Sequence, residues 1–168
     1  EKIPPLFGGG EMIQDVFEET STWAELPHKF EAGTPAIAEA IGLAEAINYI
    51  NGIGLNEIHE YEKNITKYLF KKLNQIENIE IIGPSPEIDP DRASLATFYI
   101  KNIHSNDIAE ILDSKGICIR SGHHCCQPLH RYIGIKSTAR ISMNFTTNKD
   151  EIDIFIEKLK ETINFLKM

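Results

Sequence analysis

One apolar stripe limits the folds open to this chain more than any other feature. Apolar side chains recur every three or four residues, with Glu and Lys between them, at Ile58, Tyr61, Ile65, Leu69, Leu73 and Ile76. This spacing predicts an amphipathic helix that must pack its stripe against an apolar layer. We expect Asn56 to cap the start of this helix.

The segments after the stripe supply such a layer. Residues 79–83 and 95–100 are rich in β-branched and aromatic side chains and predict short strands, as do residues 117–120. Residues 139–145 alternate, with Arg140, Ser142 and Asn144 on the polar face. We therefore expect an α+β fold in residues 55–168, with a short, mostly antiparallel sheet covered by helices on one face.

Two further helices complete that layer. Ser105 is expected to cap one of them, which Gly116 closes. Asn148 and Glu151 have the spacing of a capping box before the last helix. The core stripe of that last helix is Ile152, Phe155, Ile156, Leu159, Ile163 and Leu166.

Residues 1–54 have a different character. "PPLFGGG" favours turns, and we expect the first thirty or so residues to be irregular and to have little core of their own. Thr34 and Pro35 are expected to be the N-cap and first residue of an alanine-rich helix that Gly52 and Gly54 end. We divide the chain into two domains, residues 1–54 and residues 55–168.

Composition excludes several classes of function. The formal net charge is −8, which argues against broad contacts with nucleic acid or an anionic membrane surface. No apolar run is long enough to span a bilayer, and the first residues do not resemble a signal peptide. Three cysteines, two of them adjacent, indicate free thiols in a reducing compartment.

The chemistry is concentrated in "IRSGHHCCQPLH", residues 119–130. His123, His124, Cys125, Cys126 and His130 are all competent zinc ligands, but contiguous ligands in a loop point in opposite directions. A nucleophilic thiol fits better, because Arg120 and two imidazoles make an electropositive setting that favours the thiolate. Arg140 is either a solvated arginine or a bidentate clamp for a carboxylate.

These residues resemble a known family. "RSGHHCCQPL" is similar to the active-site cysteine loop of SufS-type (group II) cysteine desulfurases, enzymes with the class V aminotransferase fold that use pyridoxal 5′-phosphate (PLP). "KFEAGTPAIAEAIGL", "GGGEMI", "STW", "GIGLNEIHEYE" and "STARIS" resemble other segments of that family in the same order. The resemblance covers nearly the whole chain and is strongest to cyanobacterial and plastid-type members.

The resemblance implies a reaction and a role for each matched residue. The family converts L-cysteine to L-alanine, leaves a persulfide on the loop cysteine, and delivers that sulfur for Fe–S cluster assembly. It implies Cys125 as nucleophile, Arg140 and Arg120 at the substrate, and Thr34 at the cofactor phosphate of a neighbouring subunit. The same match places His123 and His124 in support of the loop and Glu19 at the dimer-side entrance.

The sequence also departs from the family pattern. The lysine that forms the Schiff base with PLP lies upstream of the "GGGEMI" segment in the family, and Lys2 is not in that motif. We therefore expect residues 55–168 to be the small C-terminal domain of a fold-type I PLP-dependent transferase, and residues 1–54 to be the end of its large domain and an inter-domain helix. Residues 146–148 stand where the family has Tyr-Asn-Thr, and Cys126 is a second thiol that we interpret as inert.

The resemblance further implies a homodimer and a SufE-like or SufU-like sulfur acceptor, in the bacterial cytoplasm or in a plastid, including one of apicoplast type. Two alternatives remain at this stage. One is a selenocysteine lyase or cysteine sulfinate desulfinase on the same fold. The other is a non-catalytic module that binds zinc or sulfur through the His/Cys loop.

Overall fold

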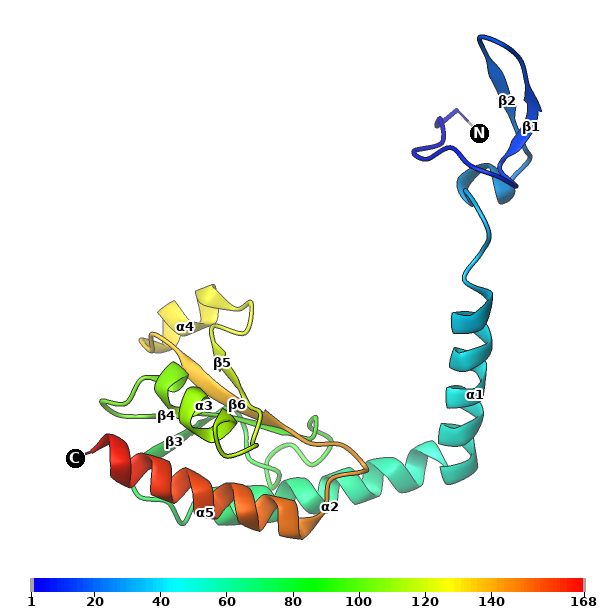
Figure 1. Cartoon of the computed structure of the whole chain (residues 1–168). Coiled ribbons are helices and arrows are strands. Elements are labelled where there is room, and N and C mark those ends of the chain that lie inside the picture. The colour runs from blue at the N-terminus through cyan, green and yellow to red at the C-terminus, as the bar shows by residue number, and fades with distance from the viewer. Residues whose placement is uncertain (1, 168) are drawn as a thin grey trace. The chain divides into compact units, whose positions relative to one another are not determined.

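The computed structural model describes residues 2–167, and the chain separates into two compact units, Glu1–Ile53 and Gly54–Met168 (Figure 1). The first unit contains strands β1 (Ile13–Val16) and β2 (Ser21–Trp23), a 3₁₀ turn η1 (His28–Phe30) and helix α1 (Ile37–Ile53). Strands β1 and β2 pair as an antiparallel hairpin.

The glycine run of the first unit allows two backbone segments to approach each other closely. A Cβ atom on Gly9 would lie 3.2 Å from the backbone N of Gly33, and the Gly33 N–H donates to Gly10 O at 2.9 Å. Gly33 itself has φ of 87°, which an L side chain rarely adopts. The glycines therefore fix the turn from which Thr34 projects.

Helix α1 starts later than the sequence predicts. It begins at Ile37, and the Ile37 N–H donates to Pro35 O at 2.8 Å, so Thr34 and Pro35 lie in a turn before the helix. The prediction of Thr34 as N-cap is wrong, because the carbonyl that accepts the opening helical hydrogen bond is Ala36 O, from Ala40 N at 3.0 Å, two residues after Thr34. Helix α1 buries none of its residues within the unit, and it exposes large apolar side chains such as Ile41, Leu43 and Tyr49.

Helix α2 (Leu55–Leu73) opens the second unit at a glycine. Gly54, with φ of 100°, occupies the N-cap position, and Asn56 lies inside the first turn. The prediction of Asn56 as cap is wrong because the positive φ of Gly54 ends one helix and starts the next within a single residue. Gly52, expected to help end the first helix, lies inside α1.

The second unit is built on a four-stranded antiparallel sheet of order β3-β4-β6-β5. The strands are β3 (Ile79–Ile82), β4 (Leu95–Ile100), β5 (Arg120–Gly122) and β6 (Thr138–Ser142). The sequence placed a strand at residues 117–120, but pairing with β6 moves the strand to residues 120–122. Strand β4 alternates half-buried and buried residues, so one face of the sheet is the core face.

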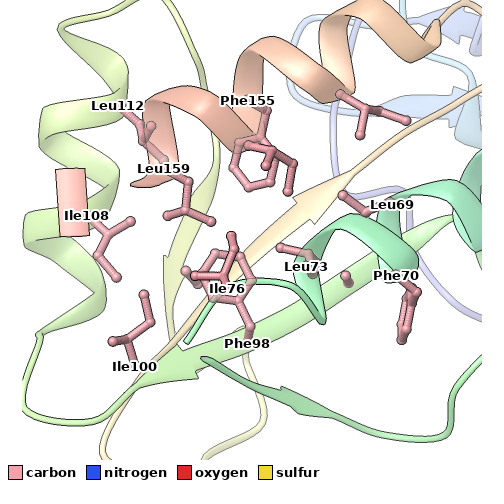
Figure 2. Close-up of a cluster of buried hydrophobic side chains, with 14 of the residues drawn as sticks. Leu69, Phe70, Leu73, Ile76, Phe98, Ile100, Ile108, Leu112, Phe155 and Leu159 are labelled. Atoms are coloured by element: carbon pink, nitrogen blue, oxygen red, sulfur yellow. The ribbon is translucent and has the colours of Figure 1, made fainter. Parts of the chain in front are cut away.

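Helices α2, α3 (Ser105–Asp113) and α5 (Lys149–Leu166) pack over that core face. Figure 2 shows side chains from the three helices meeting those of β4, with Phe98 near the middle. The core residues of the unit are Ile65, Leu69, Phe70, Leu73, Ile76, Ala96, Phe98, Ile100, Ile108, Leu112, Ala139, Met143, Ile152, Phe155, Ile156, Leu159 and Ile163. The α+β fold expected from the sequence is confirmed.

The helix ends show which capping signals were read correctly. Asn148 Oδ1 accepts from Glu151 N at 3.0 Å and Glu151 Oε2 accepts from Asn148 N at 2.9 Å, which confirms the predicted capping box. For α3, the cap is His104, whose ring Nδ1 accepts from Asn106 N, and Ser105 is the first helical residue. The prediction of Ser105 as the cap is therefore wrong by one residue, because the His104 ring accepts the capping hydrogen bond.

Candidate active site

Two arginines lie opposite each other where β5 pairs with β6. Arg120 and Arg140 are Cα partners in the antiparallel register, so their side chains leave the same face of the sheet. Two like charges in directly opposed positions destabilise a sheet when nothing binds between or above them. A pair placed in this way is typical of a site for an anionic ligand.

The cysteine loop between β5 and helix α4 (Gln127–Ile133) contains an uncommon tight turn. Cys126 N donates to His123 O at 2.8 Å, and the two central residues, His124 and Cys125, have φ of 51° and 60°. Positive φ at both central positions is the signature of a type I′ turn, which normally selects Gly, Asn or Asp. Here the turn presents a thiol at its tip.

The thiol of Cys125 is exposed and lies beside a cation. Arg120 Nη2 donates to Cys125 Sγ at 3.5 Å. The guanidinium places a full positive charge next to the sulfur. The sequence-based expectation of an electropositive setting for Cys125 therefore agrees with the geometry.

His124 turns inward from the loop. Its Nε2 lies 3.2 Å from Thr138 O, and because a carbonyl only accepts, Nε2 carries the proton and donates. Burial, followed by the nearby positive charge of Arg140, lowers the pKa of His124 below its ordinary value and keeps the ring neutral. Its Nδ1 is buried without a hydrogen-bond partner inside the protein.

Arg140 has a matching unpaired atom. Its Nε is buried without a partner, although the residue as a whole is half-buried. A buried donor without an acceptor costs free energy unless a ligand supplies the acceptor. This atom is enclosed by protein, so a carboxylate ligand can reach only the other nitrogens of the guanidinium.

A hollow of about 500 Å³ opens over the loop. It is lined by Arg120, Ser121, His123, His124, Cys125, Gln127 and Pro128. No acidic side chain lines it, so the surface above the thiol is positively charged. A small anionic molecule fits this hollow in both size and charge.

Two buried residues support the site through hydrogen bonds that the sequence did not predict. His130, first considered only as a zinc ligand, is 5% exposed, and its ring contacts Cys126 O and Thr138 Oγ1, each at 3.0 Å. Thr138 is 1% exposed and was not singled out. The available signal in the sequence was the spacing of Cys126 and His130, which lie four residues apart and therefore one turn apart on a helix.

The remaining predicted site residues lie in the first unit. Thr34 is exposed and follows the Gly33 turn, and Glu19 is exposed in the loop between β1 and β2. The roles expected for Thr34 and Glu19 stay predictions.

The geometry gives no support to a metal site in the described part of the chain. Within residues 2–167, no three His, Cys, Asp or Glu side chains are grouped to hold a metal ion. All three cysteines, Cys118, Cys125 and Cys126, are free thiols. None of the helices described in that range is long and apolar enough to cross a membrane.

The chain belongs to the class-V aminotransferase family, whose sequence model matches residues 1–155. It is 51% identical over 165 residues to a probable cysteine desulfurase of Synechocystis. This match covers 98% of this chain and 39% of that relative. A probable cysteine desulfurase of Staphylococcus aureus is 46% identical over the same share of both chains. The chain thus spans 39% of the length of these relatives.

Solved structures show the same similarity in three dimensions. A cysteine desulfurase from Thermococcus onnurineus aligns with a TM-score of 0.78 and 37% identity, over 96% of this chain and 39% of that one. A cysteine desulfurase of Escherichia coli, in its S-sulfonic acid form, aligns with the same TM-score at 26% identity. A cystine C–S lyase in complex with cysteine persulfide aligns at 21% identity and TM-score 0.66, which extends the fold to that enzyme.

Proposed function

We propose that this chain is the C-terminal part of a PLP-dependent cysteine desulfurase of the SufS type. In this proposal residues 1–54 are the end of the large domain and an inter-domain helix, and residues 55–168 are the small C-terminal domain. The observation that carries the proposal is a thiol at the tip of a type I′ turn that accepts a hydrogen bond from Arg120, whose Cα partner across the sheet is Arg140. Similarity to cysteine desulfurases over 98% of the chain supports it.

The site residues divide the work of the reaction. Arg140 holds the carboxylate of L-cysteine with its planar guanidinium, and Arg120 donates a hydrogen bond to Cys125 Sγ. Cys125 Sγ attacks the substrate sulfur, so an S–S bond forms while the substrate C–S bond breaks. The electron pair of the C–S bond stays on the substrate carbon, which accepts a proton, and the amino acid is released as L-alanine.

The chain's own residues fit part of a PLP site. Thr34, exposed after the Gly33 turn, would donate its hydroxyl to the cofactor phosphate. PLP supplies an electron sink for the substrate carbon, which no side chain of this chain provides. The hollow lined by Arg120 and Cys125 leaves room for the substrate beside the thiol.

The proposal extends to partners and family branch. The exposed apolar surface of α1 supports burial against other protein surface, and we propose that the parent enzyme is a homodimer with Glu19 near its entrance. The persulfide on Cys125 would pass to a SufE-like or SufU-like acceptor for Fe–S cluster assembly. Identity to the Synechocystis relative supports a place among cyanobacterial and plastid-type members, in bacterial cytoplasm or a plastid.

Peptide-resolved mass spectrometry of the full-length protein tests this function. Incubation with L-cysteine should yield L-alanine and add one reducible sulfur atom to the tryptic peptide 121–131, which contains Cys125 and Cys126. Cys125→Ser should abolish both, and Cys126→Ser is the matched control that should retain them. If the added sulfur is found on the peptide of the Cys126→Ser variant and is missing from that of the Cys125→Ser variant, Cys125 is the nucleophile.

Two results would contradict the proposal. One is L-alanine formation that Cys125→Ser leaves unchanged, and the other is activity confined to selenocysteine. The second result would instead assign a selenocysteine lyase on the same fold.

A further inference from the structure

We propose that His130 and Thr138 act as a pair of positioning residues that hold the Cys125 turn in its left-handed conformation and thereby set the reactivity of the thiol. The inference deepens the proposed function, since it concerns the residue that acts as nucleophile there. It rests on four contacts between the turn, helix α4 and strand β6.

The turn needs external support because its backbone is strained. His124 and Cys125 both have positive φ, and neither is glycine. A left-handed conformation is unfavourable for a residue with a Cβ, and here two such residues follow each other. Only one internal hydrogen bond, from Cys126 N to His123 O, acts within the turn against this strain.

Thr138 accepts the first of the supporting contacts. His124 Nε2 donates to Thr138 O at 3.2 Å and fixes the first left-handed residue to strand β6. The same threonine places its hydroxyl 3.0 Å from His130 Nε2 and 3.5 Å from Gly122 O, and its one proton goes to the nearer nitrogen. Because Thr138 is also the Cα partner of Gly122, one buried residue connects strand β5, the turn and helix α4.

His130 fixes the other end of the turn. Its Nδ1 lies 3.0 Å from Cys126 O, and a carbonyl only accepts, so Nδ1 carries a proton and donates. In the neutral ring, Nε2 is then the acceptor for the Thr138 hydroxyl. Cys125 therefore lies between two residues that are both linked to Thr138. His124 contacts Thr138 directly, and Cys126 is linked to it through the His130 ring.

Ring packing restricts the histidines further. The rings of His123 and His130 meet edge to face at 5.3 Å between centroids, and those of His124 and His130 are tilted at 6.2 Å. His130 is 5% exposed, so its ring cannot rotate out to solvent without opening the loop. A turn held from both sides keeps Cys125 Sγ within reach of Arg120, which is 3.5 Å away.

Competitive alkylation in the full-length protein tests the inference without requiring turnover. Trypsin separates Cys118, on peptide 116–120, from Cys125, on peptide 121–131. In a Cys126→Ala background, the ratio of the iodoacetamide alkylation rate of Cys125 to that of Cys118 therefore reports the conformation of the turn. Cys118 serves as the internal control for unfolding.

The variants are His130→Leu, which removes both ring contacts, and His130→Gln, which retains a donor and an acceptor. Thr138→Val keeps the shape but removes the hydroxyl, while Thr138→Ser restores it. Leu129→Ala is the matched control, because Leu129 is 44% exposed and adjoins His130 on α4 outside the contact network.

We expect His130→Leu and Thr138→Val to lower the ratio by about threefold to tenfold, the effect of losing one net hydrogen bond. His130→Gln and Thr138→Ser should recover most of it, and Leu129→Ala should leave it unchanged. An unchanged ratio, or equal changes at both thiols, in Thr138→Val would overturn the inference. If His130→Leu fails to fold, Thr138→Val and Thr138→Ser decide alone.

Steady-state kinetics with L-cysteine separates this inference from the proposed function. The positioning role predicts a fall in kcat with KM within about twofold of the parent, because the Arg140 clamp is unaltered. A selective fall in alkylation in a protein that never acts on L-cysteine would support the positioning role and refute the proposed function. A parallel rise in KM without a fall in kcat would assign His130 and Thr138 to substrate binding and overturn the inference.

Discussion

Replacement of Phe98 by alanine should remove a large part of the stability of the second unit. Phe98 is 0% exposed at the centre of the sheet, and its ring lies 6.5 Å from that of Phe155, tilted by 56° (Figure 2). It also pairs in register with Ala139, the residue between Thr138 and Arg140. The cavity that Phe98→Ala leaves therefore lies beside β6, the strand that supports the site.

The expected magnitude follows from burial. A fully buried Phe→Ala change costs about 3–5 kcal/mol, of which the aromatic pair with Phe155 contributes about 0.5–1.5 kcal/mol. A domain of this size has a free energy of unfolding of about 5–15 kcal/mol, so the variant loses between a fifth and most of it. Phe98→Leu keeps most of the volume and should cost under about 1.5 kcal/mol.

Urea unfolding of residues 54–168, followed by far-ultraviolet circular dichroism, measures these values. With a urea slope near 2 kcal/mol per M, Phe98→Ala should lower the midpoint by about 1.5–2.5 M. A double-mutant cycle with Phe155→Leu isolates the ring pair. A cost below about 1 kcal/mol for Phe98→Ala, at unchanged slope, would refute the assignment of Phe98 to the centre of the core.

Three further outcomes are expected. Asn148→Ala should lower the free energy of unfolding by about 1 kcal/mol in the same urea assay, because α5 loses its N-cap, and an unchanged midpoint would contradict this. Lys158 and Lys115 lower the pKa of Glu161 from 4.5 to about 2, so their pairing stabilises the fold above the ordinary glutamate range and is lost as pH falls towards 2. Glu161→Gln should therefore flatten the loss of stability between about pH 4.5 and 2 in acid titrations, and an unaltered slope there would count against the pairing. Arg140→Lys should raise KM for L-cysteine about tenfold in the full-length enzyme, since one charge-assisted hydrogen bond is lost, and wild-type KM would exclude the clamp.

Regular periodicity made most of the second unit predictable from sequence. The stripe of α5 and the alternation of β4 correspond to buried positions because burial on one face imposes those periods. The sequence predicted burial of the first turns of α2, but Tyr61 is 41% exposed and continuous burial starts only at Ile65. A stripe predicts an apolar face but not how far along the helix a neighbour covers it.

The site was only partly visible in the sequence for a different reason. The loop from Arg120 to Cys125 is contiguous, so its chemistry could be read directly. The contribution of Thr138 depends on β6 pairing with β5, which brings together residues 16 positions apart, Gly122 and Thr138. No local pattern marks a threonine whose importance comes from its neighbours across the sheet.

The apolar surface of helix α1 affects how the chain can be made in a cell. Large apolar side chains on several sides of the helix are exposed, among them Ile37 at 56%, Ile41 at 66% and Leu43 at 64%. Exposed surface of this kind is what holdase chaperones bind and what drives nascent chains to aggregate. During translation, α1 therefore needs either a chaperone or an already folded surface to receive it, so its yield should depend on the order of synthesis as much as on its own stability.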